Sequence, residues 1–142
     1  MNRIKINLPE NFKFKTEIPL RITDINYGGH LGNDKVLSLI QEARVRYLKE
    51  CGYSEMDVEG FGTIMIDAAV EYKSESFYGD VILIEVIAGD FDKLGFDMFY
   101  RLSNKESGKE IARAKTGIVI FDYKKRKIAP IPERFIQTIK TQ

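Results

Sequence analysis

The sequence predicts a single α+β domain, in which a curved antiparallel sheet of about five strands wraps around one long central helix. Apolar residues recur at helical spacing in one long segment, and at a period of two in five shorter segments. The chain has 142 residues, which is the size of one domain, and it contains no repeat, low-complexity tract or linker. We therefore expect residues 1–142 to form one domain.

The first predicted strand runs from Lys15 to Thr23, where Ile18, Leu20 and Ile22 alternate with polar residues. A loop from Asp24 to Gly32 follows, with three glycines in its last five residues. Glycine permits a sharp turn or the close approach of a ligand to the backbone. The composition of this loop makes it the first place to look for a site.

The segment after the loop predicts the central helix. Asn33 is the expected N-cap, and Asp34 favours the positive end of the helix dipole. Gly52 is a good C-terminal stop. One apolar stripe lies between them, formed by Val36, Leu39, Ile40, Ala43 and Tyr47. Such a long apolar stripe is buried most simply by a sheet that curves around it.

Past the helix, the period changes to two. The residues 64–72, 81–87, 96–102 and 111–121 are all predicted as strands, and 104–108 is a turn signal between the last two. Because short polar connections join these strands, we expect them to pair antiparallel, with the helix covering one face.

Composition excludes several classes of function. The 22 basic and 21 acidic residues leave a net charge of +1, so no single-sign field is available to bind nucleic acid. Residues 1–15 lack the apolar segment of a signal peptide, and no apolar run approaches the roughly 20 residues of a membrane span. A single cysteine, Cys51, forms no internal disulfide and no zinc cluster. We expect a cytoplasmic protein with no membrane partner and a structural Cys51.

The stretch from Arg21 to Asn33, followed by Glu42-Ala43-Arg44 and Tyr47-Leu48, resembles the 4-hydroxybenzoyl-CoA thioesterase family. In that family the pattern reads Arg, Asp-x-Asp, Gly-His-Val-Asn, Glu-x-Arg and Tyr-Leu. The likeness continues through 72–80 and 112–132, so it covers nearly the whole chain. It implies a hotdog fold, hydrolysis of an acyl-CoA or acyl-carrier-protein thioester without cofactor or metal, and a homodimer or homotetramer with sites between subunits.

The sequence departs from this pattern at the second Asp, which is the catalytic carboxylate of the family and is Asn26 here. An amide cannot act as a nucleophile or general base at neutral pH. Either another carboxylate acts in an acyl-CoA thioesterase, or the chain is a noncatalytic module that binds acyl thioesters or an acyl-carrier protein. A hydratase on the same fold is a weaker third possibility, because the single histidine lacks a hydratase-like pattern around it.

Four residues are the catalytic candidates. On an extended segment, Asp24 would point to the same side as Asn26 and share a water with it, although Asn26 could equally be a turn residue. His30, the only histidine, could polarise the substrate or bond the loop backbone. Glu42 lies off the apolar stripe. It could supply the catalytic carboxylate, or it could form a solvated pair with Arg46. A lone histidine makes a metal site improbable.

The candidate substrate-binding residues are Tyr27, Gly28, Gly29, Leu31, Asn33 and Asp67. Backbone amides at 29–31 and at the helix start could hold an oxyanion. Asp67 interrupts an apolar strand, and burying an unpaired carboxylate is costly. Asp67 therefore is exposed to water, pairs with another residue, or belongs to a functional site. The basic run 124–127 is either a solvated turn or a contact for a coenzyme A phosphate at a subunit edge.

Overall fold

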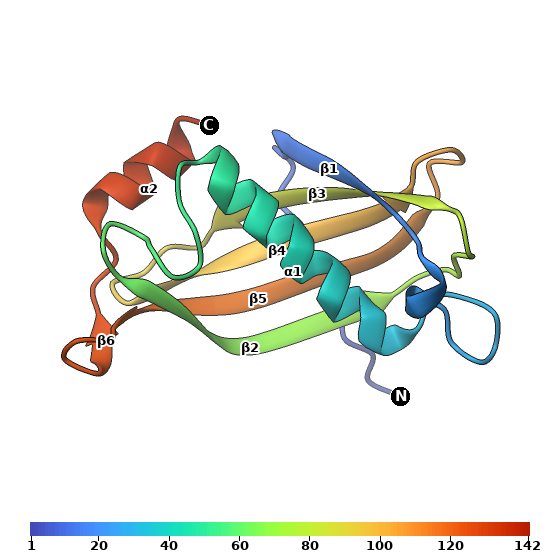
Figure 1. The fold of residues 1–142 in the computed structure, drawn as a ribbon, viewed down its shortest axis with the longest axis horizontal. Helices are drawn as coiled ribbons and strands as arrows, with labels where there is room; N and C mark the ends of the chain where they lie inside the picture. Colours follow the sequence, from blue (N-terminus) through green and yellow to red (C-terminus); the bar gives the residue numbers. More distant parts are fainter.

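The computed structural model describes residues 1–142, and one long helix lies across a sheet of six strands (Figure 1). The strands are β1 (Phe14–Pro19), β2 (Gly62–Tyr72), β3 (Val81–Gly89), β4 (Gly95–Asn104), β5 (Glu110–Asp122) and β6 (Lys127–Ala129). The order in the sheet is β1-β3-β4-β5-β2, with the short β6 beside β5, and all neighbours are antiparallel. The predicted α+β architecture is confirmed, and β2 is left as an edge strand.

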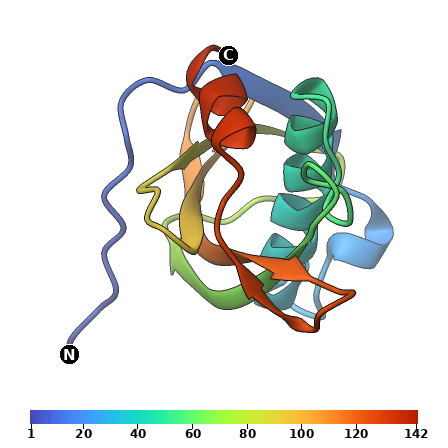
Figure 2. The same cartoon turned by 90° about the vertical axis from the view of Figure 1, so that its left-hand side faces the viewer.

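The central helix α1 (Asn33–Glu50) buries the predicted stripe against the sheet. All five stripe residues are buried, and Arg44 and Leu48 join them. Burying a large aliphatic side chain contributes about 1.5–3 kcal/mol, so this stripe anchors the helix. The end-on view in Figure 2 shows the sheet curving around the helix. No helix in the structure is long and apolar enough to span a membrane.

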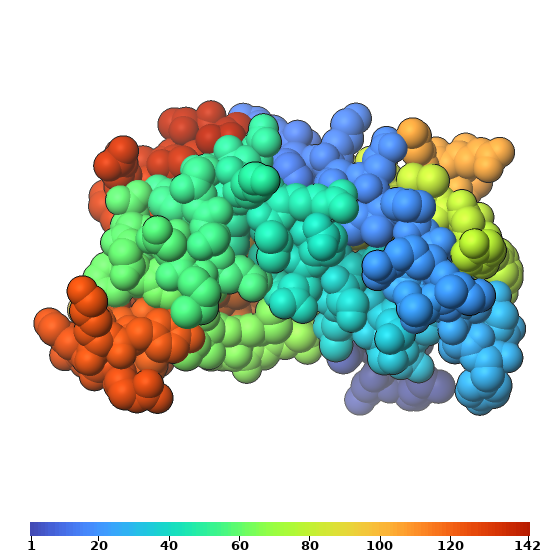
Figure 3. All heavy atoms as spheres, viewed as in Figure 1, coloured from blue at the N-terminus to red at the C-terminus, as the bar shows by residue number.

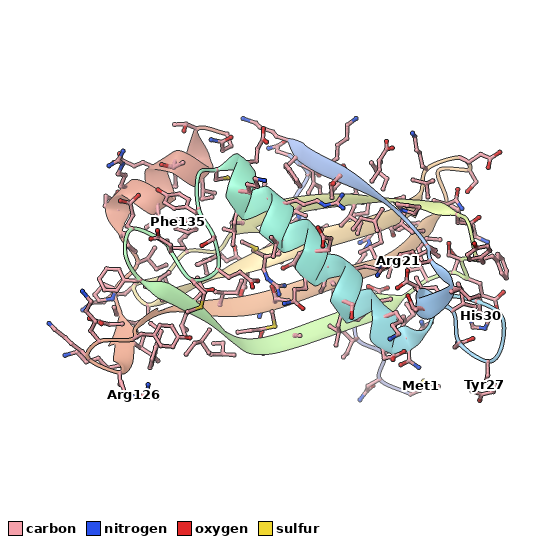
Figure 4. The ribbon with its side chains drawn as sticks, in the orientation of Figure 1. Met1, Arg21, Tyr27, His30, Arg126 and Phe135 are labelled. Atoms are coloured by element: carbon pink, nitrogen blue, oxygen red, sulfur yellow. The ribbon has the colours of Figure 1, made fainter.

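The strands, whose apolar residues alternate with a period of two, supply the other side of the core. Along β3, the inward residues Ile82, Ile84, Val86 and Ala88 are buried, while the residues between them are half-buried. A second helix, α2 (Glu133–Lys140), was not predicted, and it closes one end of the core. Its Phe135 is fully buried and packs against the rings of Tyr53, Phe91 and Phe96 (Figure 4).

Two predictions near the loop are wrong. The first strand ends at Pro19, and Ile22–Asp24 forms a 3-10 turn (η1). The turn forms because the Asp24 carboxylate accepts a hydrogen bond from the Arg21 amide at 2.8 Å, an arrangement that an extended backbone would not allow. Asn33 is the first residue of α1 rather than its cap, since Gly32 holds the cap position and no side chain caps the helix.

Candidate functional site

A pocket of about 330 Å³ lies between the start of α1 and the end of β2. Four of the predicted site residues meet there, namely Asn26, His30, Leu31 and Asn33. The remaining lining comes from α1, β2, β5 and the segment after β2, and consists of Val36, Tyr72, Lys73, Ser74, Glu75, Ile111 and Ala112. The pocket therefore combines an apolar wall with a polar mouth, as ligand sites commonly do.

A larger cavity of about 520 Å³ lies at the other end of α1, between the segment before β1 and the C-terminal helix. None of the predicted site residues lines it, and its only carboxylate side chain is the exposed Glu10. We therefore place the candidate site in the smaller pocket, because that is where polar groups capable of chemistry converge.

Asn26 organises the loop at the mouth of this pocket. Its Oδ1 accepts hydrogen bonds from the amides of Gly28, at 2.9 Å, and His30, at 3.4 Å. Its backbone amide also donates to the His30 carbonyl. The side-chain NH₂ group makes no hydrogen bond within the protein, so it remains able to donate to a ligand in the pocket. Asn26 is thus a turn residue, and its amide nitrogen is still available for a second role.

The loop is fastened to the segment that follows β2. His30 forms an antiparallel bridge with Phe77, and the Leu31 amide donates to the Ser76 carbonyl at 2.8 Å. Asp80 shapes that segment, because its Oδ2 accepts hydrogen bonds from the Ser76 hydroxyl and the Phe77 amide. These contacts fix two distant parts of the chain side by side at the pocket mouth.

This fastening brings the single histidine beside a carboxylate that the sequence analysis did not consider. Nε2 of His30 lies 3.8 Å from Oε1 of Glu75, and the two side chains are 35% and 65% exposed. Glu75 is the only acidic residue that lines the pocket. The sequence signal for Glu75 is the family-like stretch 72–80, which contains it.

The other residues at the mouth have structural partners. The Tyr72 hydroxyl donates to the Asn33 carbonyl at 3.0 Å, which ties the end of β2 to the start of α1. The Lys73 ammonium lies 3.3 Å from Glu71 and 3.6 Å from Glu110, so its charge is already balanced. Neither residue is free to act as an acid or a base.

Most of the predicted backbone donors are occupied. The Gly29 amide donates to the Asn26 carbonyl, and the amides of His30 and Leu31 are used as described above. The amides of Asn33 and Asp34 at the start of α1 make no hydrogen bond within the protein. A helix start carries partial positive charge, so these two amides are the ones able to hold an oxyanion.

Asp24 lies outside the pocket. Its side chain is 4% exposed, and Oδ2 lies 3.6 Å from the Arg21 guanidinium in addition to its bond with the Arg21 amide. The expected extended geometry, which would have placed Asp24 and Asn26 on one side, is absent because Asp24 ends the 3-10 turn. Asp24 is a buried turn residue and not a group that a substrate in the pocket could reach.

Glu42 also lies away from the pocket. It accepts a hydrogen bond from the Arg46 guanidinium at 2.8 Å, and both side chains are substantially exposed. Arg46 in turn donates to the Thr16 hydroxyl and the Glu17 carbonyl on β1. Within one subunit, Glu42 thus forms the solvated pair with Arg46.

The remaining substrate-binding candidates do not line the pocket. Tyr27, Gly28 and Gly29 form the exposed loop tip, where Figure 4 shows the Tyr27 side chain projecting outward. Oδ1 of Asp67 on β2 accepts hydrogen bonds from the Lys115 ammonium at 2.8 Å and the Gly117 amide at 2.9 Å. The Lys115 hydrogen bond lowers the pKa of Asp67. Asp67 thus has a partner within the sheet.

Cys51 follows the last residue of α1 and is buried. Burial raises the pKa of its thiol to about 11. A thiol with so high a pKa is mostly protonated at neutral pH and is a poor nucleophile. The structure therefore agrees with the predicted structural role.

A curved antiparallel sheet wrapped around one long helix is the hotdog class of fold. A model of the thioesterase-like superfamily matches residues 20–139. The chain belongs to this superfamily.

Individual relatives are distant. A 1,4-dihydroxy-2-naphthoyl-CoA thioesterase from Synechocystis superposes with a TM-score of 0.81 at 23% identity, over 89% of this chain and 95% of that one. A mutant 4-hydroxybenzoyl-CoA thioesterase in complex with 4-hydroxybenzoyl-CoA superposes with a TM-score of 0.79 at 18% identity, over 89% and 97%. A protein from Aquifex aeolicus that carries a provisional esterase name is 25% identical, over 91% and 98% of the two chains.

Proposed function

We propose that the protein is an acyl-CoA thioesterase in which Glu75 supplies the catalytic carboxylate. The observation that carries this proposal is the approach of Glu75 Oε1 to His30 Nε2, 3.8 Å, at the mouth of the pocket that Asn26 also lines. Superfamily membership supports thioester hydrolysis as the general activity. The two thioesterases named above are described as CoA thioesterases, which favours CoA over a carrier protein as the thiol.

The geometry supports a water-mediated route. The Glu75 carboxylate takes a proton from water as the water oxygen attacks the thioester carbon. The negative charge that develops on the carbonyl oxygen meets the free amides of Asn33 and Asp34 at the helix start. The carbon–sulfur bond then breaks, and the thiolate of CoA takes the proton from Glu75, leaving the free acid.

Asn26 and His30 act as supporting groups in this scheme. The NH₂ group of Asn26 is free to donate to the attacking water or to the carbonyl oxygen, because only its Oδ1 is used by the loop. The backbone of His30 is fastened to that of Phe77 by the bridge, so the ring extends toward Glu75 from a backbone that is held in place. A group whose position is fixed in this way needs little reorganisation during the reaction.

The same proposal includes a homodimer built through the edge of β2. This strand has a free edge, and the four consecutive residues 65–68 are exposed, including Ile66 at 62%. An exposed apolar edge strand pairs readily with another chain unless it is blocked. The pocket lies at the end of this strand, so a second subunit on β2 would border the site.

A noncatalytic acyl-thioester binding protein is the second candidate. It is favoured by Asn26 itself, which stands where the family has its catalytic carboxylate and serves as a turn residue. In that case the pocket would hold the thioester, and Glu75 would be a solvated partner of His30.

Thiol release from a panel of acyl-CoAs of different length and aromaticity separates the two candidates. We expect the wild type to release thiol, and Glu75→Gln to lower kcat by about 10²–10⁴-fold, the usual contribution of a general base. Glu42→Gln is the matched control, because it removes an exposed carboxylate outside the pocket. A wild type that binds acyl-CoA and leaves it intact supports the binding protein, and full activity in Glu75→Gln refutes the assigned carboxylate.

A further inference from the structure

The cavity of about 520 Å³ at the end of α1 remote from the candidate site has features of a second binding site, and we call it the distal cavity. Its walls are the segment 10–14, the end of β3 and α2, together with Tyr47 of α1. Figure 3 shows α2 in red, the end of α1 in green and the segment before β1 in blue along one edge of the molecule. The distal cavity shares no lining residue with the candidate site, so a ligand in one does not occupy the other.

The distal cavity exists because β1 begins too late to cover the whole edge of β3. On one side, β3 pairs with β4 as far as Gly89. On the other side, its pairing with β1 stops at Val86, which lies opposite Phe14. The residues 10–13 form no strand and lie as a separate wall. The edge of β3 at 87–89 is therefore open, and the missing stretch of β1 leaves room for a ligand.

Aromatic rings line much of the distal cavity, and they are already packed. The rings are those of Phe12, Phe14, Tyr47 and Phe91. Phe14 meets Tyr47 edge to face, with 5.4 Å between ring centroids, and Phe91 stacks on Phe96 at 5.6 Å. Rings that are held in place need little ordering when a ligand binds, and they favour an aromatic ligand through stacked or edge-to-face contacts.

The hydroxyl of Tyr47 has a proton that no protein group accepts. Tyr47 is only 4% exposed, and its oxygen accepts a long hydrogen bond, 3.4 Å, from the Ala88 amide. Burial raises the pKa of Tyr47 to about 12, so the hydroxyl is protonated at neutral pH. A buried donor without an acceptor is costly. Because Tyr47 lines the distal cavity, an oxygen of a ligand there would supply the missing acceptor.

Two lysines give the mouth of the distal cavity a positive charge. Lys13 and Lys140 are exposed lining residues, and neither forms an ion pair. The only carboxylate side chain in the lining is Glu10, so the lysines outnumber it. In contrast, Lys73 in the candidate site is balanced by two glutamates. The mouth of the distal cavity therefore favours an anionic group on the ligand.

We infer that the distal cavity binds an aromatic carboxylate that carries a hydroxyl or carbonyl oxygen at the end opposite its carboxylate. The carboxylate faces Lys13 and Lys140, the ring lies among the aromatic side chains, and the remote oxygen accepts the proton of the Tyr47 hydroxyl. A rigid ring suits such a site better than a flexible chain, because it loses less freedom on binding. The inference is independent of the proposed function, since no residue of the candidate site contributes to it.

Three naphthalene compounds test the two ends of the ligand separately. The compound 6-hydroxy-2-naphthoate has both polar groups, 2-naphthoate lacks the hydroxyl, and 2-naphthol lacks the carboxylate. In calorimetric titrations at low salt, we expect the wild type to bind 6-hydroxy-2-naphthoate about threefold or more tightly than either analogue, because one hydrogen bond or one exposed charge contributes modestly. Equal affinity for the three compounds, or no binding of any of them, overturns the inference.

Two variants assign each end of the ligand to its residues. In Tyr47→Phe, 6-hydroxy-2-naphthoate should lose its advantage over 2-naphthoate and keep its advantage over 2-naphthol. In Lys13→Gln/Lys140→Gln, the reverse is expected. The matched control for the lysines is Lys109→Gln/Lys125→Gln, which removes two exposed lysines without ion pairs outside the cavity and should keep both advantages. The inference fails if Tyr47→Phe or the variant at the mouth keeps both advantages.

A filled cavity tests where the ligand binds. Ile87→Trp adds volume at a half-buried position that lines the distal cavity, and it should weaken binding of 6-hydroxy-2-naphthoate about tenfold or more. Leu83→Trp is the matched control, because it makes a similar change at a half-buried position on the same face of β3 outside the cavity. Circular dichroism shows whether both variants are folded. Unweakened binding by folded Ile87→Trp overturns the inference, and if this variant does not fold, the Tyr47 and lysine variants decide.

Discussion

His30 and Glu75 meet at the mouth of the pocket, with Nε2 and Oε1 3.8 Å apart, because an antiparallel bridge between His30 and Phe77 fastens their two segments together. In the proposed thioesterase, the carboxylate would therefore reach the site from the segment after β2, whereas the family that the sequence resembles places it in the loop before α1. Position 26, which is Asn here, is then free to hold the loop in shape. Both positions line one pocket, and this arrangement predicts that a carboxylate at one can replace a carboxylate at the other.

Asn26→Asp should restore activity to the Glu75→Gln variant. An aspartate at position 26 can still accept the hydrogen bonds from the Gly28 and His30 amides with one oxygen, and the other oxygen faces the pocket. We expect thiol release by the double variant to exceed that of Glu75→Gln by about tenfold or more, a fraction of the full contribution of a general base. Equal rates for the two variants would mean that a carboxylate at position 26 cannot reach the thioester.

Asp24→Ala should lower stability. The buried carboxylate accepts the Arg21 amide, and its loss leaves that donor without a partner, at a cost of about 1–3 kcal/mol. Asp24→Asn keeps one acceptor oxygen and should be milder. Urea denaturation, followed by circular dichroism, ranks the stability of the wild type, Asp24→Asn and Asp24→Ala. A midpoint for Asp24→Ala equal to that of the wild type would refute the structural role.

The fold was largely predictable because its elements are strongly periodic. The α1 stripe and the alternation along β3 each bury a continuous apolar face, and such faces are visible in sequence. The helix α2 has only eight residues, and β6 has three, so neither is long enough to show a convincing period. Tertiary packing of Phe135, rather than local pattern, holds α2 in place.

The site was predictable only in part. Four predicted residues, Asn26, His30, Leu31 and Asn33, line the candidate pocket because they share one loop and the helix start, which are contiguous in sequence. Glu75 was missed because its link to His30 is a non-local bridge, and no spacing rule connects the two. Asp24 was misplaced for a local reason, since the 3-10 turn that it closes turns its side chain into the protein.

Arg44→Ala should lower stability much more than Arg46→Ala, the other arginine change on α1. Its guanidinium is buried and donates to Glu55 at 2.6 Å and to the Tyr100 hydroxyl at 3.1 Å, and Tyr100 also bonds Thr116. Removing one member of a buried charge pair costs about 3–5 kcal/mol, and partial exposure of Glu55 places the loss toward the lower value. Arg46→Ala breaks an exposed pair and should cost about 0.2–1 kcal/mol. Calorimetric melting of both variants tests the difference, and equal losses would contradict it.

Stability should fall as the pH rises above about 8.5, partly because of Cys51. Burial raises the pKa of its thiol to about 11 in the folded protein, and the nearby Glu50 adds to the shift, whereas an unfolded chain has a thiol pKa near 8.5. Between these values the unfolded state releases a proton that the folded state retains, so rising pH favours unfolding. The stabilising effect of the protonated thiol is complete below about pH 8.5 and is lost toward pH 11.

Chemical denaturation of the wild type and Cys51→Ala at pH 7 and pH 10 measures this effect. The variant is less stable at pH 7, because it loses buried apolar volume, but its stability should decline less between the two pH values. Burial also raises the pKa of Tyr47, to about 12. Above about pH 10, where tyrosine ionises in the unfolded chain, Tyr47 would add its own pH dependence to the stability, so pH 10 is the upper limit of the comparison. A thiol reagent gives an independent readout at pH 8, where Cys51 should react slowly in the folded protein and rapidly in urea. Rapid reaction of the folded protein, together with parallel pH profiles, would show that the thiol is not protected as the structure indicates.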